Sequence, residues 1–207
     1  MPIRIKYMKL LNYFFIFLVF LSPLNLMASG DSIGSFYENK WKMTKRSIQY
    51  MKKGEVLANS TVESTGKKQS FSMKVAAIHK KKCSKVLRKL SLFESYKDWI
   101  SFIKKSDYNP NRKLLTINAN HTLLPFPMIV HVIVDRPTKK GVYPFIFPTG
   151  LFRGLKGEFI IDQKENKCLF FAKSHWQGQK KLPDFAIELF SDALTKLAGE
   201  ALFRKIK

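Results

Sequence analysis

The chain has 207 residues, of which 45% are hydrophobic and 18 are phenylalanine, and it carries a formal charge of +22 at pH 7. This apolar content excludes an intrinsically disordered chain, and the length suits a single domain with a sizeable core. The excess of Lys and Arg favours anionic partners such as a membrane surface or acidic envelope polymers, although a solvated lysine-rich surface explains the same charge.

The first 28 residues have the layout of a secretory signal peptide. Residues 10–20 are an almost unbroken apolar run, which follows the basic residues Arg4, Lys6 and Lys9 and precedes small residues that place the cleavage site after Ala28. An uncleaved anchor is the alternative, but the run is shorter than the about 20 residues that a membrane span needs. We therefore expect an exported, periplasmic protein, with membrane association left open, and export argues against a nucleic-acid partner.

The order of the predicted elements indicates the α+β class. Periodicity predicts a first helix at residues 35–51, ended by Gly54, and then a hairpin of strands at 55–64 and 69–78. Two short helices follow at 82–91 and 93–102. Alternating apolar and polar residues then predict strands at 102–109, 113–124, 128–135, 142–147, 155–162 and 167–176.

The last predicted element, residues 183–207, is one long helix with an apolar stripe. Three- and four-residue steps place on one face Ala186, Phe190, Ala193, Leu194, Leu197, Ala198, Ala201 and Leu202. The opposite face is filled by Glu188, Asp192, Thr195, Lys196 and Glu200. Because the stripe mixes Ala with Leu and Phe, the helix could close a cavity against the sheet as readily as it could fill a core.

Several short patterns appear in an order that resembles the START-like, polyketide-cyclase-like superfamily (SRPBCC). They are residues 53–56, residues 71–78, the series Val86, Leu90, Phe93, Tyr96, Trp99, Ile100 and Ser106, then residues 124–127, the glycines Gly150, Gly154 and Gly157, and finally residues 174–176 with Leu182 and Pro183. Exported bacterial START-related proteins are the most similar subgroup. The family often has an acid shortly before the position of Tyr96, and Glu94 stands close to that position here.

The resemblance implies a helix-grip fold, in which a curved antiparallel sheet wraps the C-terminal helix around an apolar cavity. Together with the signal peptide (1–28), it divides the chain into an N-terminal helical extension (29–53) and a START-like domain (54–207). Most members bind or carry a lipid, isoprenoid or similar molecule, and a minority catalyse cyclisation or aromatisation. The candidate cavity residues are Trp99, His121, Tyr143, Phe145, Phe147, Phe152, Arg153, Trp176, Phe190, Leu194 and Leu197.

Most of these side chains have a plain structural alternative, because aromatic residues on a strand face usually fill a core. His121 would lie on the apolar face of its strand, either as a hydrogen-bonded core residue or as a polar contact or base for a ligand. The loop residues 151–153, an apolar pair beside Arg153, could dip into a bilayer and meet a lipid phosphate, or fold back onto the sheet.

The sequence shows no nucleotide-binding, hydrolase or metal-ligand motif, and we expect no cofactor and no metal. An oxidising compartment permits a disulfide between Cys83 and Cys168, but their apolar surroundings favour two buried free thiols. We therefore expect non-catalytic binding or transfer of a hydrophobic small molecule or lipid. A cyclase-like enzyme would need an acid or base in the cavity, such as His121, Tyr143 or Arg153, and a basic envelope protein would need no cavity.

Overall fold

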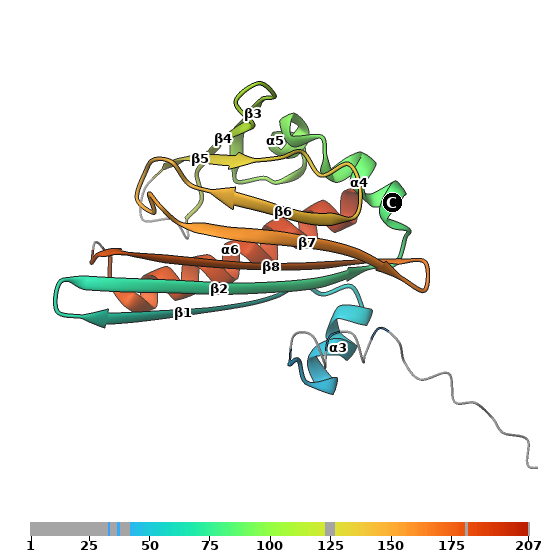
Figure 1. Ribbon diagram of the computed structural model, residues 1–207, viewed down its shortest axis with the longest axis horizontal. Coiled ribbons are helices and arrows are strands. Elements are labelled where there is room, and N and C mark those ends of the chain that lie inside the picture. Colours follow the sequence, from blue (N-terminus) through green and yellow to red (C-terminus); the bar gives the residue numbers. More distant parts are fainter. Residues whose placement is uncertain (1–32, 34–36, 38–41, 123–126, 181, 207) are drawn as a thin grey trace, which may run out of the picture. The chain divides into compact units, whose positions relative to one another are not determined.

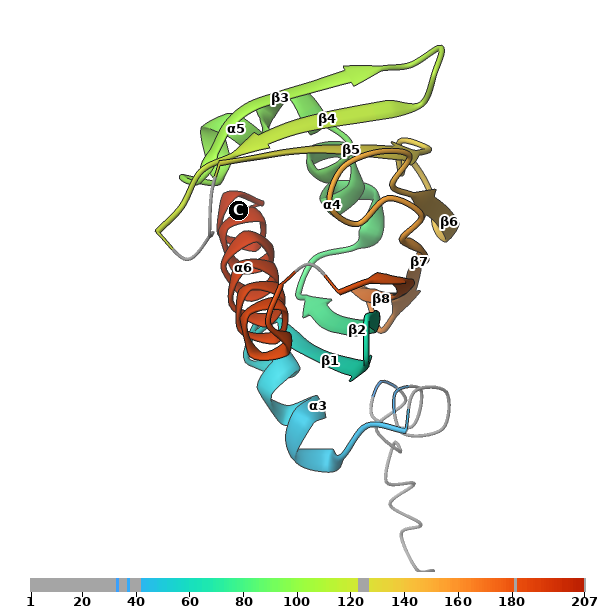
Figure 2. The same cartoon turned by 90° about the vertical axis from the view of Figure 1, so that its left-hand side faces the viewer.

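The computed structural model describes residues 33, 37, 42–122, 127–180 and 182–206. Within this part of the chain, eight strands form one antiparallel sheet in the order β1-β2-β8-β7-β6-β5-β4-β3. The strands are β1 (Leu57–Thr65), β2 (Lys68–His79), β3 (Ile103–Asn109), β4 (Leu114–Ala119), β5 (Met128–Val134), β6 (Gly141–Ile146), β7 (Lys156–Lys164) and β8 (Lys167–Gln179). The sheet curves around the long helix α6 (Asp184–Lys205), as Figures 1 and 2 show.

Short helices complete the α+β architecture. They are α3 (Lys45–Lys52), α4 (Cys83–Leu90), η1 (Phe93–Ser95) and α5 (Tyr96–Trp99). None of the helices in the described ranges combines the length and the hydropathy that a membrane crossing requires. The predicted fold class is confirmed, because a curved antiparallel sheet grips a long C-terminal helix.

The central strands bury both of their faces. In the register of β2 and β8, Phe71 lies opposite Trp176 and Met73 opposite Ser174, so these side chains share the concave face that α6 covers. The other face carries Ala76, Ile78, Leu169 and Phe171, which pack against Ile33, Tyr37, Ile48 and Met51 of the N-terminal extension. The Tyr37 hydroxyl donates to the carbonyl of Ala77 at 3.0 Å and anchors this extension to the sheet.

The helix predicted at residues 35–51 is interrupted. Tyr37 is helical but residues 42–44 are not, and α3 starts at Lys45, where the hydroxyl of Thr44 accepts a hydrogen bond from the Ser47 N–H at 3.2 Å, which is an N-cap. Ile48 and Met51 form its buried face, and Gly54 ends it with a φ of 97°, as expected for a residue after a helix. The rest of the predicted helix, at 35–36 and 38–41, lies outside the described residues.

The predicted strand at 113–124 is too long. The structure ends β4 at Ala119, and the next residue, Asn120, donates its N–H to the carbonyl of Phe102 at 2.8 Å. His121 therefore lies on no strand, and its ring packs edge-on against Phe102 at 5.7 Å. The predicted residues 123 and 124 lie outside the described ranges.

The expectation of two free thiols is wrong, because Cys83 and Cys168 form a disulfide that joins the start of α4 to β8. Their Cα atoms are 4.6 Å apart, within the range that a bridge requires. The Cys83 N–H also donates to Gln163 Oε1 at 3.0 Å, so the β7–β8 hairpin holds the start of α4 in place. An 85-residue separation gives no sign of this proximity in the sequence.

Replacement of both cysteines by alanine should lower the free energy of unfolding. The bridge closes a loop of 85 residues, and removal of such a constraint costs about 2–5 kcal/mol. Urea denaturation of the wild type and of Cys83→Ala/Cys168→Ala measures the difference. Wild type unfolded in the presence of a reductant is the control, and it should approach the stability of the double variant. Equal midpoints for oxidised wild type and the double variant would show that the bridge contributes no stability.

His79 gives the fold a pH dependence in a narrow range. The residue is buried at the end of β2, with its ring 5.1 Å from that of Phe203, and its Nδ1 accepts from the Lys81 N–H at 3.1 Å. Burial, followed by the charges of Lys81 and Lys80, lowers the pKa of His79 below its ordinary 6.5, although the carbonyls of Phe203 and Ile206 act in the opposite direction. The folded state thus binds fewer protons than the unfolded chain just below that pH.

The free energy of unfolding should therefore fall as the pH drops from about 7 to about 5, because the unfolded state takes up the proton first. The carboxyl groups of Glu94 and Asp184, whose pKa values are lowered by hydrogen bonds from Arg136 and from Ser64 and Gln69, lose their contributions only at lower pH. His79→Gln should flatten the dependence in this window. His175→Gln, on the exposed face of β8, is the matched control and should keep the wild-type slope; the same slope for His79→Gln as for wild type would contradict the assignment.

Candidate functional site: an apolar cavity

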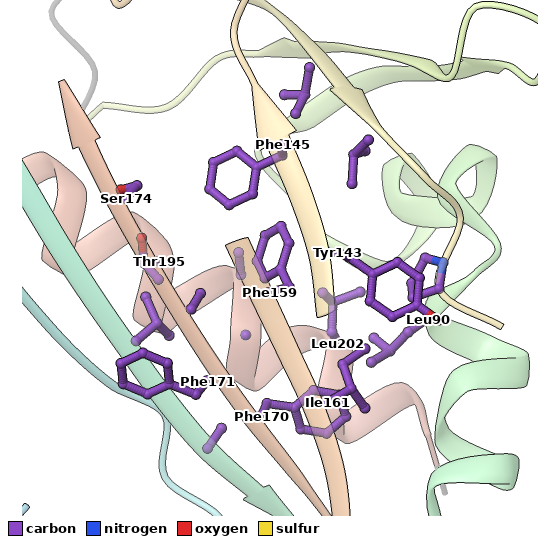
Figure 3. Close-up of a pocket in the computed structure, with 18 of the residues that line it drawn as sticks. Leu90, Tyr143, Phe145, Phe159, Ile161, Phe170, Phe171, Ser174, Thr195 and Leu202 are labelled. Carbon is purple, nitrogen blue, oxygen red and sulfur yellow. The ribbon is translucent and has the colours of Figure 1, made fainter. Parts of the chain in front are cut away.

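A cavity of about 430 Å³ lies between the concave face of the sheet, helix α6 and the α4–η1–α5 segment. Figure 3 shows side chains from all three parts around it. Strands β6, β7 and β8 supply Tyr143, Phe145, Phe159, Ile161 and Phe170, and Leu90 comes from α4. The volume is in the range of pockets that hold small molecules, and the walls are almost entirely hydrocarbon.

A glycine allows the aromatic wall to form. Gly157 lies directly opposite Phe145 in the β6–β7 register, and a Cβ at this position would come within 2.7 Å of the Phe145 ring. Without the Cβ, the Phe145 ring can lie over β7, where its centroid is 4.8 Å from that of Phe159. Phe159 keeps 44% of its surface accessible although its neighbours in the register face inward, because the space beside its ring is unfilled.

Small residues on α6 leave space unfilled between this helix and the sheet. The helix lines the cavity with Thr195, Ala198, Gly199, Leu202 and Phe203. Steps of three and four residues put them on one face. A Cβ on Gly199 would approach Val56 Cγ2 to 2.9 Å, so this glycine lets the helix lie close to the start of β1.

This face of α6 matches the predicted one only in part, since Ala198 and Leu202 of the predicted stripe line the cavity. Leu194 and Leu197 do not line the cavity, and Leu197 is 41% exposed, whereas Thr195, which the pattern placed on the polar face, lines it. The side chain of Phe190 lies outside the described set. The pattern failed because apolar residues surround α6, with Phe185 and Leu189 also exposed, so spacing alone leaves the rotation of the helix open.

Hydrogen bonds to β1 set that rotation. Glu188 Oε1 accepts from the Val62 N–H at 2.9 Å, and the carbonyl of Glu188 accepts from the Ser60 hydroxyl at 3.2 Å. Glu188 was expected on the solvated face of the helix. A strand N–H that has no partner on a neighbouring strand needs another acceptor. The Glu188 carboxylate is therefore held against the sheet, and α6 is oriented so that Thr195 and Ala198 face the cavity.

Of the candidate residues from the sequence, Tyr143, Phe145 and Phe147 line the cavity. Whether they contact a ligand stays a prediction. Five others lie elsewhere within the described structure: Trp99, His121, Phe152, Arg153 and Trp176. Trp99 packs beside Tyr96, with their ring centroids 6.0 Å apart, on the short helix α5.

The loop between β6 and β7 folds back onto the sheet. Trp176 is 4% exposed, and its indole N–H donates to the carbonyl of Arg153 at 3.1 Å. The Phe152 ring packs edge-on against Trp176 at 5.5 Å and lies 5.7 Å from Phe71. The sequence left open whether residues 151–153 dip into a bilayer or fold back onto the sheet, and this structure has the second arrangement. Trp176 and Phe152 therefore belong to the core.

Sequence reasoning missed the part of the wall that comes from the short helices, Leu90, Phe93 and Tyr96, and the polar pair Ser174 and Thr195. For Ser174 the signal was present, since it alternates with Ala172 and Trp176 along β8. For the short helices there was none, because their position against the sheet depends on long-range contacts such as the disulfide.

Few polar groups reach the cavity, and most of them are already paired. The Tyr143 hydroxyl donates to the Lys139 carbonyl at 2.6 Å, and the Tyr96 hydroxyl donates to the Leu90 carbonyl at 2.7 Å. Burial raises the pKa of Tyr96, so this phenol stays neutral. The described lining contains no histidine, and its two charged residues, Asp135 and Lys173, pair with Lys113 at 2.9 Å and with Glu158 at 3.0 Å.

Comparisons with known proteins agree on the fold. No family model and no curated protein matches the chain in sequence. Among solved structures, a START superfamily protein from Mycobacterium smegmatis is similar with a TM-score of 0.52 and 13% identity, over 65% of this chain and 96% of that one. The Zhui aromatase/cyclase from Streptomyces sp. R1128 is similar with a TM-score of 0.56 and 7% identity, over 66% and 93%.

The protein XoxI from Bacillus cereus is also similar, with a TM-score of 0.51 and 11% identity over 65% of this chain and 94% of that one. The chain therefore has a START-like fold, as its sequence predicted. At these identities the likeness establishes the fold and not the activity, since one fold hosts many functions.

Proposed function

We propose that this protein binds and carries a hydrophobic small molecule in the cavity between its sheet and α6, without catalysis. The single observation that carries this proposal is the unfilled apolar space of about 430 Å³ in the concave interior. A protein interior normally packs without voids larger than a water molecule. A space of this size, walled by aromatic and aliphatic side chains, suits an apolar ligand rather than water.

Apolar burial would supply a large part of the gross binding free energy. A ligand that buries roughly 300 Å² of apolar surface gains about 7 kcal/mol at ~25 cal/mol per Å². A Kd of about 1 μM corresponds to ~8 kcal/mol net, and the costs of association are subtracted from the apolar gain, so micromolar binding needs a larger buried area or further contacts.

The chemistry of the walls supports carriage over cyclisation. A cyclase-like reaction requires an acid or base at the reacting carbon atoms. His121 and Arg153, which the sequence offered for this role, lie outside the lining. The remaining candidate, Tyr143, has its hydroxyl engaged by the backbone of Lys139.

The proposed place of action is the cell envelope. A disulfide is typical of an oxidising compartment, and the bridge between Cys83 and Cys168 supports the export that the N-terminal sequence predicts. The large positive charge would attract the protein to anionic membrane surfaces, where hydrophobic molecules are found. Contact with such a surface is part of the proposal.

Replacement of Ala198 by Trp should abolish uptake of a hydrophobic probe. Ala198 lines the cavity, and an indole ring there would occupy much of the space that a ligand needs. The measurement is the fluorescence of Nile red, a neutral dye that brightens in apolar surroundings, titrated with the full chain purified under oxidising conditions. We expect at least a tenfold loss of affinity.

Leu197→Trp is the matched control, because this neighbour is 41% exposed and points away from the cavity. It should bind the dye as wild type does. Circular dichroism of both variants checks the fold, and Ala198→Leu provides a milder filling if the Trp variant unfolds. Equal uptake by wild type, Ala198→Trp and Leu197→Trp would place the dye elsewhere, and no uptake by wild type would contradict the proposal. Native mass spectrometry with organic extraction then identifies any molecule that copurifies.

A further inference from the structure

One buried polar group in the cavity wall has no partner. Ser174 is 7% exposed on β8, and its Oγ makes no hydrogen bond within the described structure. A buried hydroxyl is normally paired, because an unpaired one loses its hydrogen bonds to water without replacement. Since Ser174 lines the cavity, a ligand atom is a candidate for the missing partner.

A second hydroxyl lies close to the first. Thr195 Oγ1 on α6 donates to the sulfur of Met73 at 3.5 Å. Met73 stands directly opposite Ser174 in the β2–β8 register, so both hydroxyls border the same methionine side chain. Figure 3 shows the two residues, one from the strand and one from the helix, on the same side of the pocket. A thioether is a weak acceptor, so Thr195 gives up this contact at little cost.

Among the described lining residues, no unpaired cation is available to neutralise an acidic ligand. The only basic residue among the described lining side chains is Lys173, and its ammonium group pairs with Glu158 at 3.0 Å. Lys173 is exposed, since it alternates along β8 with the inward-facing Ala172 and Ser174. A carboxylate or phosphate buried in this cavity would stay unpaired, which is costly in a medium of low polarity.

We propose that the cavity selects a neutral, mostly apolar molecule with one hydroxyl or carbonyl oxygen, which is seated between Ser174 and Thr195. This inference rests on the proposed carriage and adds the class of cargo to it. The two hydroxyls can both donate and accept, so they fit either kind of oxygen. The Ser174 Oγ is covered in the empty protein, and rotation about its Cα–Cβ bond to another staggered position brings it to the ligand.

A series of ligands with one chain and different head groups tests this selection. Dodecane, 1-dodecanol and dodecanoate, the last at a pH where it is ionised, compete with Nile red for the cavity of the full chain. We expect the alcohol to bind about five- to tenfold more tightly than the alkane, which is the effect of one or two hydrogen bonds. Dodecanoate should be the weakest of the three.

Variants assign the preference to the two hydroxyls. Ser174→Ala and Thr195→Val each should reduce the ratio of the alkane Kd to the alcohol Kd, and the double variant should bring it to one or below, because the alcohol would then bury an unpaired hydroxyl. Ser174→Ala removes an unpaired buried group, so the fold should tolerate it. Ser72→Ala is the matched control, because this hydroxyl lies 3.0 Å from His175 Nδ1 on the other face of the sheet, and it should keep the wild-type ratio.

The possible results separate the two proposals. If none of the three ligands nor the dye binds, the proposed carriage fails. If all three bind with similar affinity, or if the double variant keeps the preference for the alcohol, carriage stands and the selection for a neutral oxygen-bearing ligand is overturned. Tightest binding of dodecanoate would also overturn it.

Discussion

The attachment of α6 to the edge strand β1 is the constraint on which the cavity depends. Near the start of the helix, Asp184 Oδ1 accepts from the Ser64 hydroxyl and from Gln69 Nε2, each at 2.7 Å. One turn later Glu188 accepts from the Val62 N–H, and Gly199 then lets the helix lie against Val56. Hydrogen bonds are directional, whereas apolar contacts are not, so these bonds fix the helix rotation, which the apolar residues on several sides of α6 leave undetermined.

The far wall of the cavity needs its own attachments, because α4, η1 and α5 are short. The disulfide joins the start of α4 to β8. At the other end, the Arg136 guanidinium donates to the Ser91 carbonyl at 2.7 Å, forms an ion pair with Glu94 and lies 4.4 Å from the centroid of the Tyr108 ring. A bidentate and stacked arginine of this kind holds a segment in one geometry, which a lysine could not do. With both walls fixed independently, the space between them need not collapse.

The sequence predicted those features that depend on local pattern. The pattern along residues 69–78 and 167–176 correctly gave the strands, because a side-chain period of two needs no knowledge of distant neighbours. The rotation of α6 was predicted only in part: Ala198 and Leu202 line the cavity as expected, but Leu197 does not and Thr195 does. The rotation depends on bonds between Glu188 and a strand more than a hundred residues earlier. Cys83 and Cys168 were missed as a pair for the same reason. The family resemblance made up for part of this loss. The order of its short patterns along the chain indicated the helix-grip fold, which no single segment shows.

The distribution of charge separates what the cavity does from what the surface does. The charged residues at the lining pair with Lys113 and Glu158, so the interior presents carbon and two hydroxyls, while the excess of Lys and Arg faces solvent. Attraction between exposed charges is screened by salt over about 8 Å at physiological ionic strength, but apolar burial is not screened in this way. The affinity for a neutral ligand and the proposed attraction to an anionic membrane therefore arise from different physical terms. The surface charge would bring the protein to the membrane without contributing to the retention of its cargo. Substitutions on the surface could therefore change the attraction to the membrane while the ligand affinity is kept, and substitutions in the cavity could do the reverse.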